Sequence, residues 1–464
     1  MKKYRRYILM AVLAVVVAVS GVKWWQSRRI DTDAILAQSI LKDKNFAVKV
    51  QQIEADGIKA YLLEEHSNPI IAVSFMFKNS GAVHVADEEL GLTTLLADML
   101  TNGAGEYDAL QFKDIGEEYG VRLGFGSSDD AISGFVLMPT ANKEMAVKLL
   151  TSALYQPHFA QEYMELTKKQ MLTAIRKRKE RPDSVLADKF AEIIYAGHPY
   201  ARQSLGTEST VPNLSVAALR NFMRRHLTKQ NIIIGIAGDI TAEEAQQLMI
   251  DIFGDLPAQF AEDELPQIAI NSSGKLHYID RDSPQAITAF TVRGTKRNSD
   301  DFYPLYIANY IFGGSGLNSR ISKVIREDNG LTYGIYTYLS SSDSAAMLSG
   351  GYSSTPDNFE EARQLLLEEW QKIAAGDVSA AELQQAKEAM IASHNLRFAS
   401  IGGIADMLVA MQQYDLGQDF LDKRNEYVDA VTLEQVNEVA RKYFATEPDF
   451  VIIGAQKTLK TEDK

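Results

Sequence analysis

The sequence contains no cysteine. This absence excludes disulfide bonds, thiolate catalysis and cysteine-ligated zinc sites, whatever the compartment. Histidine is also sparse, since the chain has seven and no two of them lie closer than 18 residues along the sequence. No single helix therefore presents the pair of histidines with which many zinc enzymes hold their metal.

Basic residues are outnumbered, with 48 Lys and Arg against 61 Asp and Glu and a formal net charge of −13. Nucleic acid is not an expected partner, because phosphate backbones are bound through basic patches. We interpret the acidity as that of an ordinary soluble surface. The length of 464 residues and the hydrophobic content of 46% predict a globular protein of two or three domains.

Residues 1–30 differ in composition from the rest of the chain. Four basic residues among the first six precede an apolar run over 7–22, and Trp24 and Trp25 follow it. The segment is either a signal peptide cleaved after 18–20 or a membrane anchor through residues 7–25. We favour the anchor because the tryptophans fit an interfacial belt and lengthen a short apolar run. Either alternative exports the remainder.

The exported part contains an internal repeat. A strand-like stretch that begins at Asn68 (NPIIAVSFMFKNSG) has a counterpart at Ser283 (SPQAITAFTVRGTK), and the prolines of the two differ by 215 positions. Glycines in the apolar runs that close each half, at 238 and 454, differ by 216. Between these strands each half is mainly amphipathic helix, and Ser or Thr precedes helices at 215–227 and 432–444 as an N-cap.

The repeat predicts an α+β fold with two homologous domains, each a mostly antiparallel sheet with helices packed on one face. We place the first domain at 48–260 and the second at 276–460. The stretch 261–275, rich in acid, Pro, Ser and Gly, is the expected linker.

The stretch GLTTLLADML (91–100) predicts a helix. Its apolar residues recur at the spacing of one helical face and would face the core: Leu92, Leu95, Leu96, Met99 and Leu100. Thr94 and Asp98 are four residues apart and would lie one above the other on the same side.

Several stretches in the right order resemble the pitrilysin/insulinase family of zinc metallopeptidases. They are 91–100, the stretch 198–241 that ends in N-IIIGIA-GD, and FGGSGLNSRISKVIREDNGLTY at 312–333. The resemblance covers about residues 48–460 and implies a short, two-domain, processing-peptidase-like form. It also implies a bacterial source, with the protein on the periplasmic side of the inner membrane, or in the periplasm if the signal is cleaved.

The resemblance also shows what the sequence lacks. The family's H-x-x-E-H motif supplies two zinc ligands and a glutamate base, and here Thr94, Ala97 and Asp98 stand at those three positions. The third ligand, a glutamate about 76 residues further on in the family, falls where this chain has Thr173 and Ala174. We therefore expect no metal and no catalytic residue in this chain.

Other polar residues do not replace the site. The isolated His198 is interpreted as a loop or packing residue, and the acidic run 87–89 as a solvated turn or helix start. The basic residues 176–179, next to the third ligand position, would repel a metal cation.

The second half retains one functional element of the family, in IREDNGLTY. In the resembling peptidases an Arg and a Tyr at this spacing hold the substrate backbone and stabilise the tetrahedral oxyanion, and Arg326 and Tyr333 stand at those positions. On residue type alone, Arg326 would pair with a surface acid and Tyr333 would pack on the sheet. Asn329-Gly330 should end the preceding helix in left-handed geometry.

Some members of the family function as two different chains, of which one carries the zinc helix and the other the Arg/Tyr element. The leading hypothesis is therefore a non-catalytic, peptide-binding subunit, with zinc held by a partner of the same family. One alternative is a peptide-binding or scaffold protein of the cell envelope without any link to proteolysis. Another is an independent metallopeptidase with an unusual site, against which the shortage of ligands argues.

Overall fold

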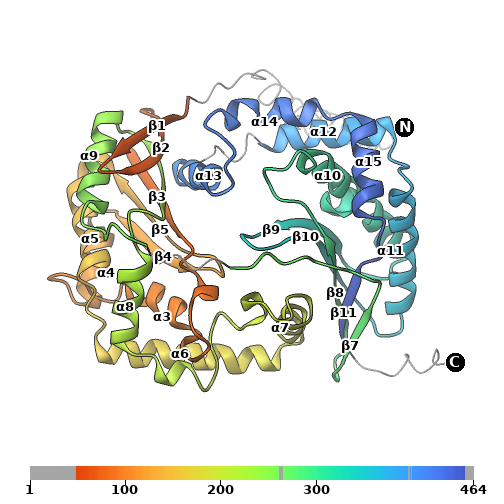
Figure 1. The fold of residues 1–464 in the computed structure, drawn as a ribbon, viewed down its shortest axis with the longest axis horizontal. Coiled ribbons are helices and arrows are strands. Elements are labelled where there is room, and N and C mark those ends of the chain that lie inside the picture. The colour runs from red at the N-terminus through yellow and green to blue at the C-terminus, as the bar shows by residue number, and fades with distance from the viewer. Residues whose placement is uncertain (1–48, 261–264, 395–397, 399, 455–464) are drawn as a thin grey trace, which may run out of the picture. The chain divides into compact units, whose positions relative to one another are not determined.

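The first half of the chain forms a six-stranded sheet in the computed structural model, which describes residues 49–260, 265–394, 398 and 400–454 (Figure 1). Its order is β1-β2-β6-β3-β5-β4, and every neighbouring pair is antiparallel except β2 with β6. The strands are β1 (Gln51–Ala55), β2 (Ile58–Glu64), β3 (Ile70–Lys78), β4 (Arg122–Ser127), β5 (Ala131–Pro139) and β6 (Ile232–Gly238).

The second half repeats this topology in a five-stranded sheet of order β7-β11-β8-β10-β9, in which only β7 and β11 are parallel. The strands are β7 (Leu276–Asp280), β8 (Ala286–Arg293), β9 (Ile335–Ser341), β10 (Ala346–Ser354) and β11 (Asp449–Gly454). The order matches β2-β6-β3-β5-β4 strand for strand, so the structure confirms the predicted pair of homologous α+β halves.

Helices occupy the connections at equivalent places in the two halves. Those of the first half are α3 (Leu92–Met99), α4 (Ala109–Glu118), α5 (Lys143–Tyr155), α6 (Gln161–Glu180), α7 (Pro182–Ile194), α8 (Val216–His226) and α9 (Ala242–Phe253). Those of the second half are α10 (Phe302–Asn309), α11 (Phe359–Ala374), α12 (Ala380–His394), α13 (Ile401–Gln413), α14 (Phe420–Asp429) and α15 (Leu433–Tyr443).

The predicted helix caps are confirmed. The Ser215 hydroxyl accepts a hydrogen bond from the backbone N–H of Ala218 at the start of α8. Thr432 and Gln435 form a reciprocal capping box at the start of α15. These side chains satisfy backbone donors that the first helical turn leaves open, and so fix where the two helices begin.

The sequence-based expectation that helices cover one face of each sheet is incomplete. On the second face of the first sheet lies α13, which comes from the second half: Ile404, Ala405 and Leu408 are buried against Ala72 and Ala237. The exchange is reciprocal, because α7 of the first half packs on the second sheet, where Leu186 meets Val451 and Ile453 (Figure 1).

The strand sequences explain why both sheet faces need a cover. The central strand β6 reads IIIGIAG and its counterpart β11 reads DFVIIG, and nearly every residue of both is buried. Continuous apolar runs of this kind are typical of strands covered on both faces, whereas an alternating pattern marks a half-exposed strand. The packing of α7 and α13 therefore crosses the sequence boundary between the halves.

The proposed signal or anchor, residues 1–30, lies outside the described residues. Within the described part, no helix is both long enough and apolar enough to cross a membrane.

Candidate functional site

The helix at the degenerate zinc position is α3, and the predicted apolar stripe faces the core. Leu92, Leu95, Leu96 and Met99 are all buried in the main cluster of the first half. Gly91 precedes the helix with φ of 94°, a left-handed conformation that favours glycine. Packing in the core therefore holds α3 in place. The chemistry that the helix can support depends on Thr94, Ala97 and Asp98.

The residues on that side do not fit a zinc ion. Ala97 is buried and has no ligand atom, and the Thr94 hydroxyl lies 3.4 Å from the carbonyl oxygen of Ser204, to which it donates. Asp98 is open to solvent, although partial desolvation by the surrounding protein raises the pKa of its carboxyl. Across the described residues, no three His, Asp or Glu side chains come together in a way that could hold a metal.

The residues predicted at the third ligand position, Thr173 and Ala174, lie on α6 and are equally unsuited to hold zinc. The Thr173 hydroxyl is engaged by its own helix, donating to the carbonyl of Lys169 at 2.8 Å, and Ala174 offers no donor atom. Arg176 and Lys179 both form ion pairs with Glu208. This stretch of α6 is therefore a surface of paired charges, and no step of a hydrolytic reaction can be assigned to it.

His198 has a structural role, as expected from its isolation. Its side chain is buried, its Nδ1 accepts from the backbone N–H of Tyr200, and its Nε2 donates to the carbonyl of Pro266. Burial lowers the pKa of the imidazole, so the neutral form that makes both bonds is favoured.

The structure brings together a histidine pair that sequence spacing did not reveal. The rings of His84 and His226 lie 6.4 Å apart and line a cavity of about 340 Å³ with Glu89 and Arg225. The His226 ring stacks on Phe222 at 4.2 Å, so it is held by packing. Because the two histidines are 142 positions apart, no local pattern in the sequence could have indicated the pair.

The Arg/Tyr element is a π-helix followed, after a short connection, by the strand β9. Arg326 lies in the π-helix Ser322–Asp328. Gly330, two residues after it, adopts the predicted left-handed conformation with φ of 65°, whereas Asn329 does not, with φ of −116°. The backbone N–H of Leu331 donates to the carbonyl of Ile325 across this turn, at 3.0 Å. Single-turn π-helices are rare and occur often at functional sites.

The two side chains of this element face solvent to different degrees. Tyr333 is 90% exposed, the most exposed of the large hydrophobic side chains in the described residues, so it does not pack on the sheet. Arg326 is half-buried, and within the described chain it forms no ion pair and no side-chain hydrogen bond. Both side chains are therefore available to a ligand.

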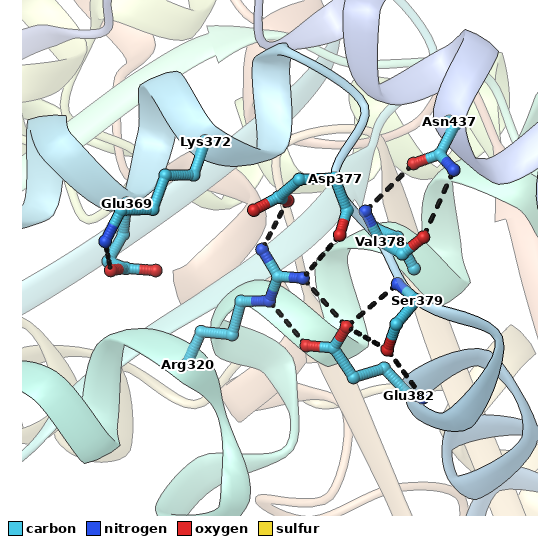
Figure 2. A network of polar contacts seen from close by, with 8 residues as sticks. All are labelled: Arg320, Glu369, Lys372, Asp377, Val378, Ser379, Glu382 and Asn437. Carbon is cyan, nitrogen blue, oxygen red and sulfur yellow. Dashed lines mark hydrogen bonds and ion pairs between the residues drawn. The ribbon is translucent and has the colours of Figure 1, made fainter.

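A partly exposed ion network holds the chain just before this element (Figure 2). Arg320 donates to both carboxylate oxygens of Glu382, at 2.6 and 2.8 Å, and to the carboxylate of Asp377 at 2.6 Å. Burial alone would raise the pKa of Glu382, but hydrogen bonds from Arg320 and Ser379 outweigh it and lower this pKa to about 2. The network ties the glycine-rich turn at 312–320 to the loop between α11 and α12.

Two equivalent hairpin turns meet at the carboxyl end of β9. One joins β4 to β5 in the first half, and the other joins β9 to β10 in the second half. In each, a serine N–H donates to an alanine carbonyl at 2.9 Å, from Ser128 to Ala131 in one half and from Ser342 to Ala345 in the other. They are joined by Asp130, whose carboxylate accepts from the backbone N–H of Asp343 at 3.2 Å and from the Tyr200 hydroxyl.

Comparisons with known proteins agree with this geometry. Residues 61–208 match the sequence model described as insulinase (peptidase family M16), and residues 213–390 match the one described as the peptidase M16 inactive domain. The chain belongs to the insulinase family.

Individual relatives are distant but cover most of the chain. An uncharacterized zinc protease of Mycobacterium leprae, ML0855, is 26% identical over 68% of this chain and 72% of its own length. A protein of Helicobacter pylori named non-peptidase homolog YmxG is 21% identical over 89% of this chain and 95% of its own. A crystal structure of a peptidase M16 inactive domain from Pseudomonas fluorescens has the same fold, with a TM-score of 0.82, 23% identity, and coverage of 88% and 98%.

Proposed function

We propose that this protein is the non-catalytic, peptide-binding subunit of a heterodimeric zinc metallopeptidase. Its partner would be a chain of the same family that carries H-x-x-E-H and holds the zinc. Residues 1–30 would anchor this subunit to the bacterial inner membrane, with the rest in the periplasm. The substrate would be a peptide or an unfolded protein segment.

The observation that carries the proposal is the exposure of Tyr333, seven residues after an Arg326 that has no acidic partner in the described chain. A phenol left 90% in solvent contributes little to the core. A fixed guanidinium and a phenol are suitable donors to an oxygen on which negative charge develops during peptide hydrolysis. They would supply these donors in trans, to a peptide bound at the zinc of the partner.

The comparisons support a non-catalytic role. The relative from Helicobacter pylori is named a non-peptidase homolog, and the structure from Pseudomonas fluorescens is described as an inactive domain. Those descriptions apply to those proteins, and they support the prediction that Thr94, Ala97 and Asp98 replace the zinc-site residues here.

The test is a reconstituted pair of this chain with the H-x-x-E-H chain that co-purifies from native membranes. We expect Arg326→Ala and Tyr333→Ala each to lower kcat by about tenfold or more, because each removes one donor to the oxyanion. Tyr333→Phe should lose most of the same activity, since only the hydroxyl is removed. Lys323→Ala, an exposed residue of the same π-helix, is the matched control and should retain full turnover.

Two outcomes would contradict the proposal. Turnover within about twofold of the unmodified pair, roughly 0.4 kcal/mol of barrier, would show that neither side chain acts in trans. The absence of any H-x-x-E-H chain among the stoichiometric partners would favour the scaffold function of the cell envelope instead.

A further inference from the structure

Arg326 lies on a short helical segment whose placement depends on its surroundings. The segment spans residues 320–328, beginning as α-helix and continuing as the π-helix, and Arg326 is in its last turn. Helices shorter than about 12 residues are only marginally stable by themselves in water. The direction in which the Arg326 guanidinium points is therefore set by the contacts that fix the two ends of this segment.

Arg320 is the first helical residue of the segment, and its guanidinium is held along two edges (Figure 2). Nε and Nη2 donate to the two carboxylate oxygens of Glu382, whereas Nη1 donates to the carboxylate of Asp377 and Nη2 lies 3.3 Å from the carbonyl of Asp377. Four of its five N–H groups are thus used, and a planar group bonded in this way cannot rotate. Arg320 is therefore occupied within the chain, unlike Arg326.

The groups that hold Arg320 are themselves fixed by the loop between α11 and α12. The Glu382 carboxylate accepts from the backbone N–H of Ser379 at 2.9 Å and from its hydroxyl at 2.7 Å. The backbone N–H and C=O of Val378 are both bonded to the Asn437 side chain on α15, at 3.0 and 3.2 Å. Through this loop the contacts connect α15 to Arg320 (Figure 2).

The other end of the segment is tied to the second sheet. The Thr332 hydroxyl donates to the carbonyl of Ser353 on β10, at 2.6 Å. Between the two ends, Ile321 and Ile325 are fully buried in the core of the second half. The core holds one side of the segment, and the contacts of Arg320 determine where its first turn lies.

The position of Arg320 requires an arginine and not merely a positive charge. A cation in the first turn of a helix is unfavourable, because the helix dipole is positive at that end. The carboxylates of Glu382 and Asp377 outnumber the guanidinium and reverse the local charge. A lysine would keep the charge, but its single ammonium cannot bond to two groups along two edges of a plane.

We propose that Arg320 is a positioning residue, whose fork of bonds to Glu382 and Asp377 fixes the first turn of the segment and thereby directs Arg326 toward the peptide oxygen that becomes charged. Arg320 does not itself touch the substrate. The inference rests on the proposed trans-acting role of Arg326, and it adds the group that keeps Arg326 in place. A displacement of about 1 Å in such a donor can lower the rate by about 100-fold, so a small movement of the segment is sufficient.

The test measures turnover of the reconstituted pair with Arg320→Lys, which keeps the charge and loses the fork. We expect kcat to fall about fivefold or more while KM stays within about twofold, because contacts that bind the substrate equally in ground and transition states are unchanged. Arg363→Lys on α11 is the matched control. Arg363 pairs with Glu360 three residues away on the same helix, and this change should retain full turnover.

A double change shows whether Arg320 acts through Arg326. In a pair that already carries Arg326→Ala, the addition of Arg320→Lys should lower kcat by less than about 1.5-fold, because the side chain that it positions is gone. A further loss as large as in the unmodified pair would show that Arg320 acts by another route and would overturn the proposal. Full turnover of Arg320→Lys in the otherwise unmodified pair would overturn it as well.

Hydrogen exchange of the full-length chain without its partner gives a readout independent of turnover. The amides of 321–331 should exchange about tenfold faster in Arg320→Lys, whereas those of β8 and β11 should be unchanged, because only this segment is released. Unchanged exchange over 321–331 would show that the core alone holds the segment and would overturn the proposal. If exchange rises throughout the second half, Asp377→Asn replaces Arg320→Lys, since it keeps the contacts to Glu382, and the same two readouts decide.

Failure of this inference differs from failure of the proposed function. If Arg326→Ala lowers kcat and Arg320→Lys does not, Arg326 acts in trans but is positioned by other contacts. If Arg326→Ala itself leaves turnover unchanged, the proposed function fails and the positioning role fails with it.

Discussion

Gly235 on β6 lies directly against the backbone of Ala405 on α13. A methyl group at Gly235 would come 2.3 Å from the carbonyl oxygen of Ala405 and 2.8 Å from Cβ of Leu408. Glycine is therefore what allows a helix from the second half to approach the first sheet this closely. The contact is at the centre of the exchange between the halves, so its disturbance should affect the whole fold.

We expect Gly235→Ala to lower the free energy of unfolding by about 1–3 kcal/mol, because α13 must move to admit the methyl group. Urea denaturation followed by circular dichroism measures this as a lower midpoint. The matched control is Gly402→Ala on α13, where no atom lies within 4 Å of the new methyl group. It should be neutral or stabilise by about 0.5 kcal/mol, since alanine favours helix over glycine. An unchanged midpoint for Gly235→Ala would show that α13 is not held in this position.

The Arg320 network predicts a pH dependence of stability. Glu382 has a pKa of about 2 in the folded chain against 4.5 without these contacts. A depressed pKa contributes stability that is complete above about pH 4.5 and is lost as pH falls toward 2. Glu382→Gln should therefore lower the melting temperature at pH 7, and the difference from the unmodified chain should shrink below pH 4.

The cost of Glu382→Gln at pH 7 should be about 2 kcal/mol, because Arg320 loses a bidentate charged partner. Glu360→Gln is a suitable control, since Glu360 pairs with Arg363 on the exposed surface of α11. It should change stability by less than about 1 kcal/mol. Equal effects of the two changes at all pH values would contradict the role given to the network.

The degenerate zinc positions predict that metal removal has no effect on this chain. Purified residues 31–464 should contain far less than one zinc per chain by elemental analysis, and EDTA should leave the melting temperature unchanged. The physical reason is that Thr94, Ala97 and Ala174 provide no adequate ligand. Stoichiometric zinc, removed by the chelator together with peptidase activity, would overturn this reading of α3.

The same positions define a gain-of-binding variant. Thr94→His, Ala97→Glu and Asp98→His would restore two ligands and a base, but not the third ligand. Adding Ala174→Glu should tighten zinc binding at least tenfold over the triple change if α6 still faces α3 as the family resemblance implies. Comparable zinc affinity of the two variants would show that the third position has moved away.

Local features of the fold could be predicted from the sequence. The offset of 215 and 216 between prolines and glycines indicated two homologous halves, and periodic apolar residues indicated α3. Ser215 and Thr432 were identifiable as caps because capping depends on residues three apart. All of these signals are short-range or repeat at a fixed interval.

The features of the fold and site that could not be predicted from the sequence depend on contacts between distant segments. We predicted helices on only one face of each sheet, because nothing local in the sequence places α13 on the second face of the first sheet or α7 on that of the second. The partners of Arg320 lie 57 and 62 positions away, and His84 meets His226 from 142 positions away. The exposure of Tyr333 likewise follows from how the chain leaves the π-helix, not from its residue type.

The exchange of α7 and α13 has a consequence for synthesis. When β6 is complete, at residue 238, the ribosome must still add 175 residues before α13 ends at 413. At roughly 5–20 residues per second, the apolar second face of the first sheet has no cover for about 9–35 s. The nascent first half therefore cannot complete its packing on its own, because the helix that covers its sheet is made only after most of the chain.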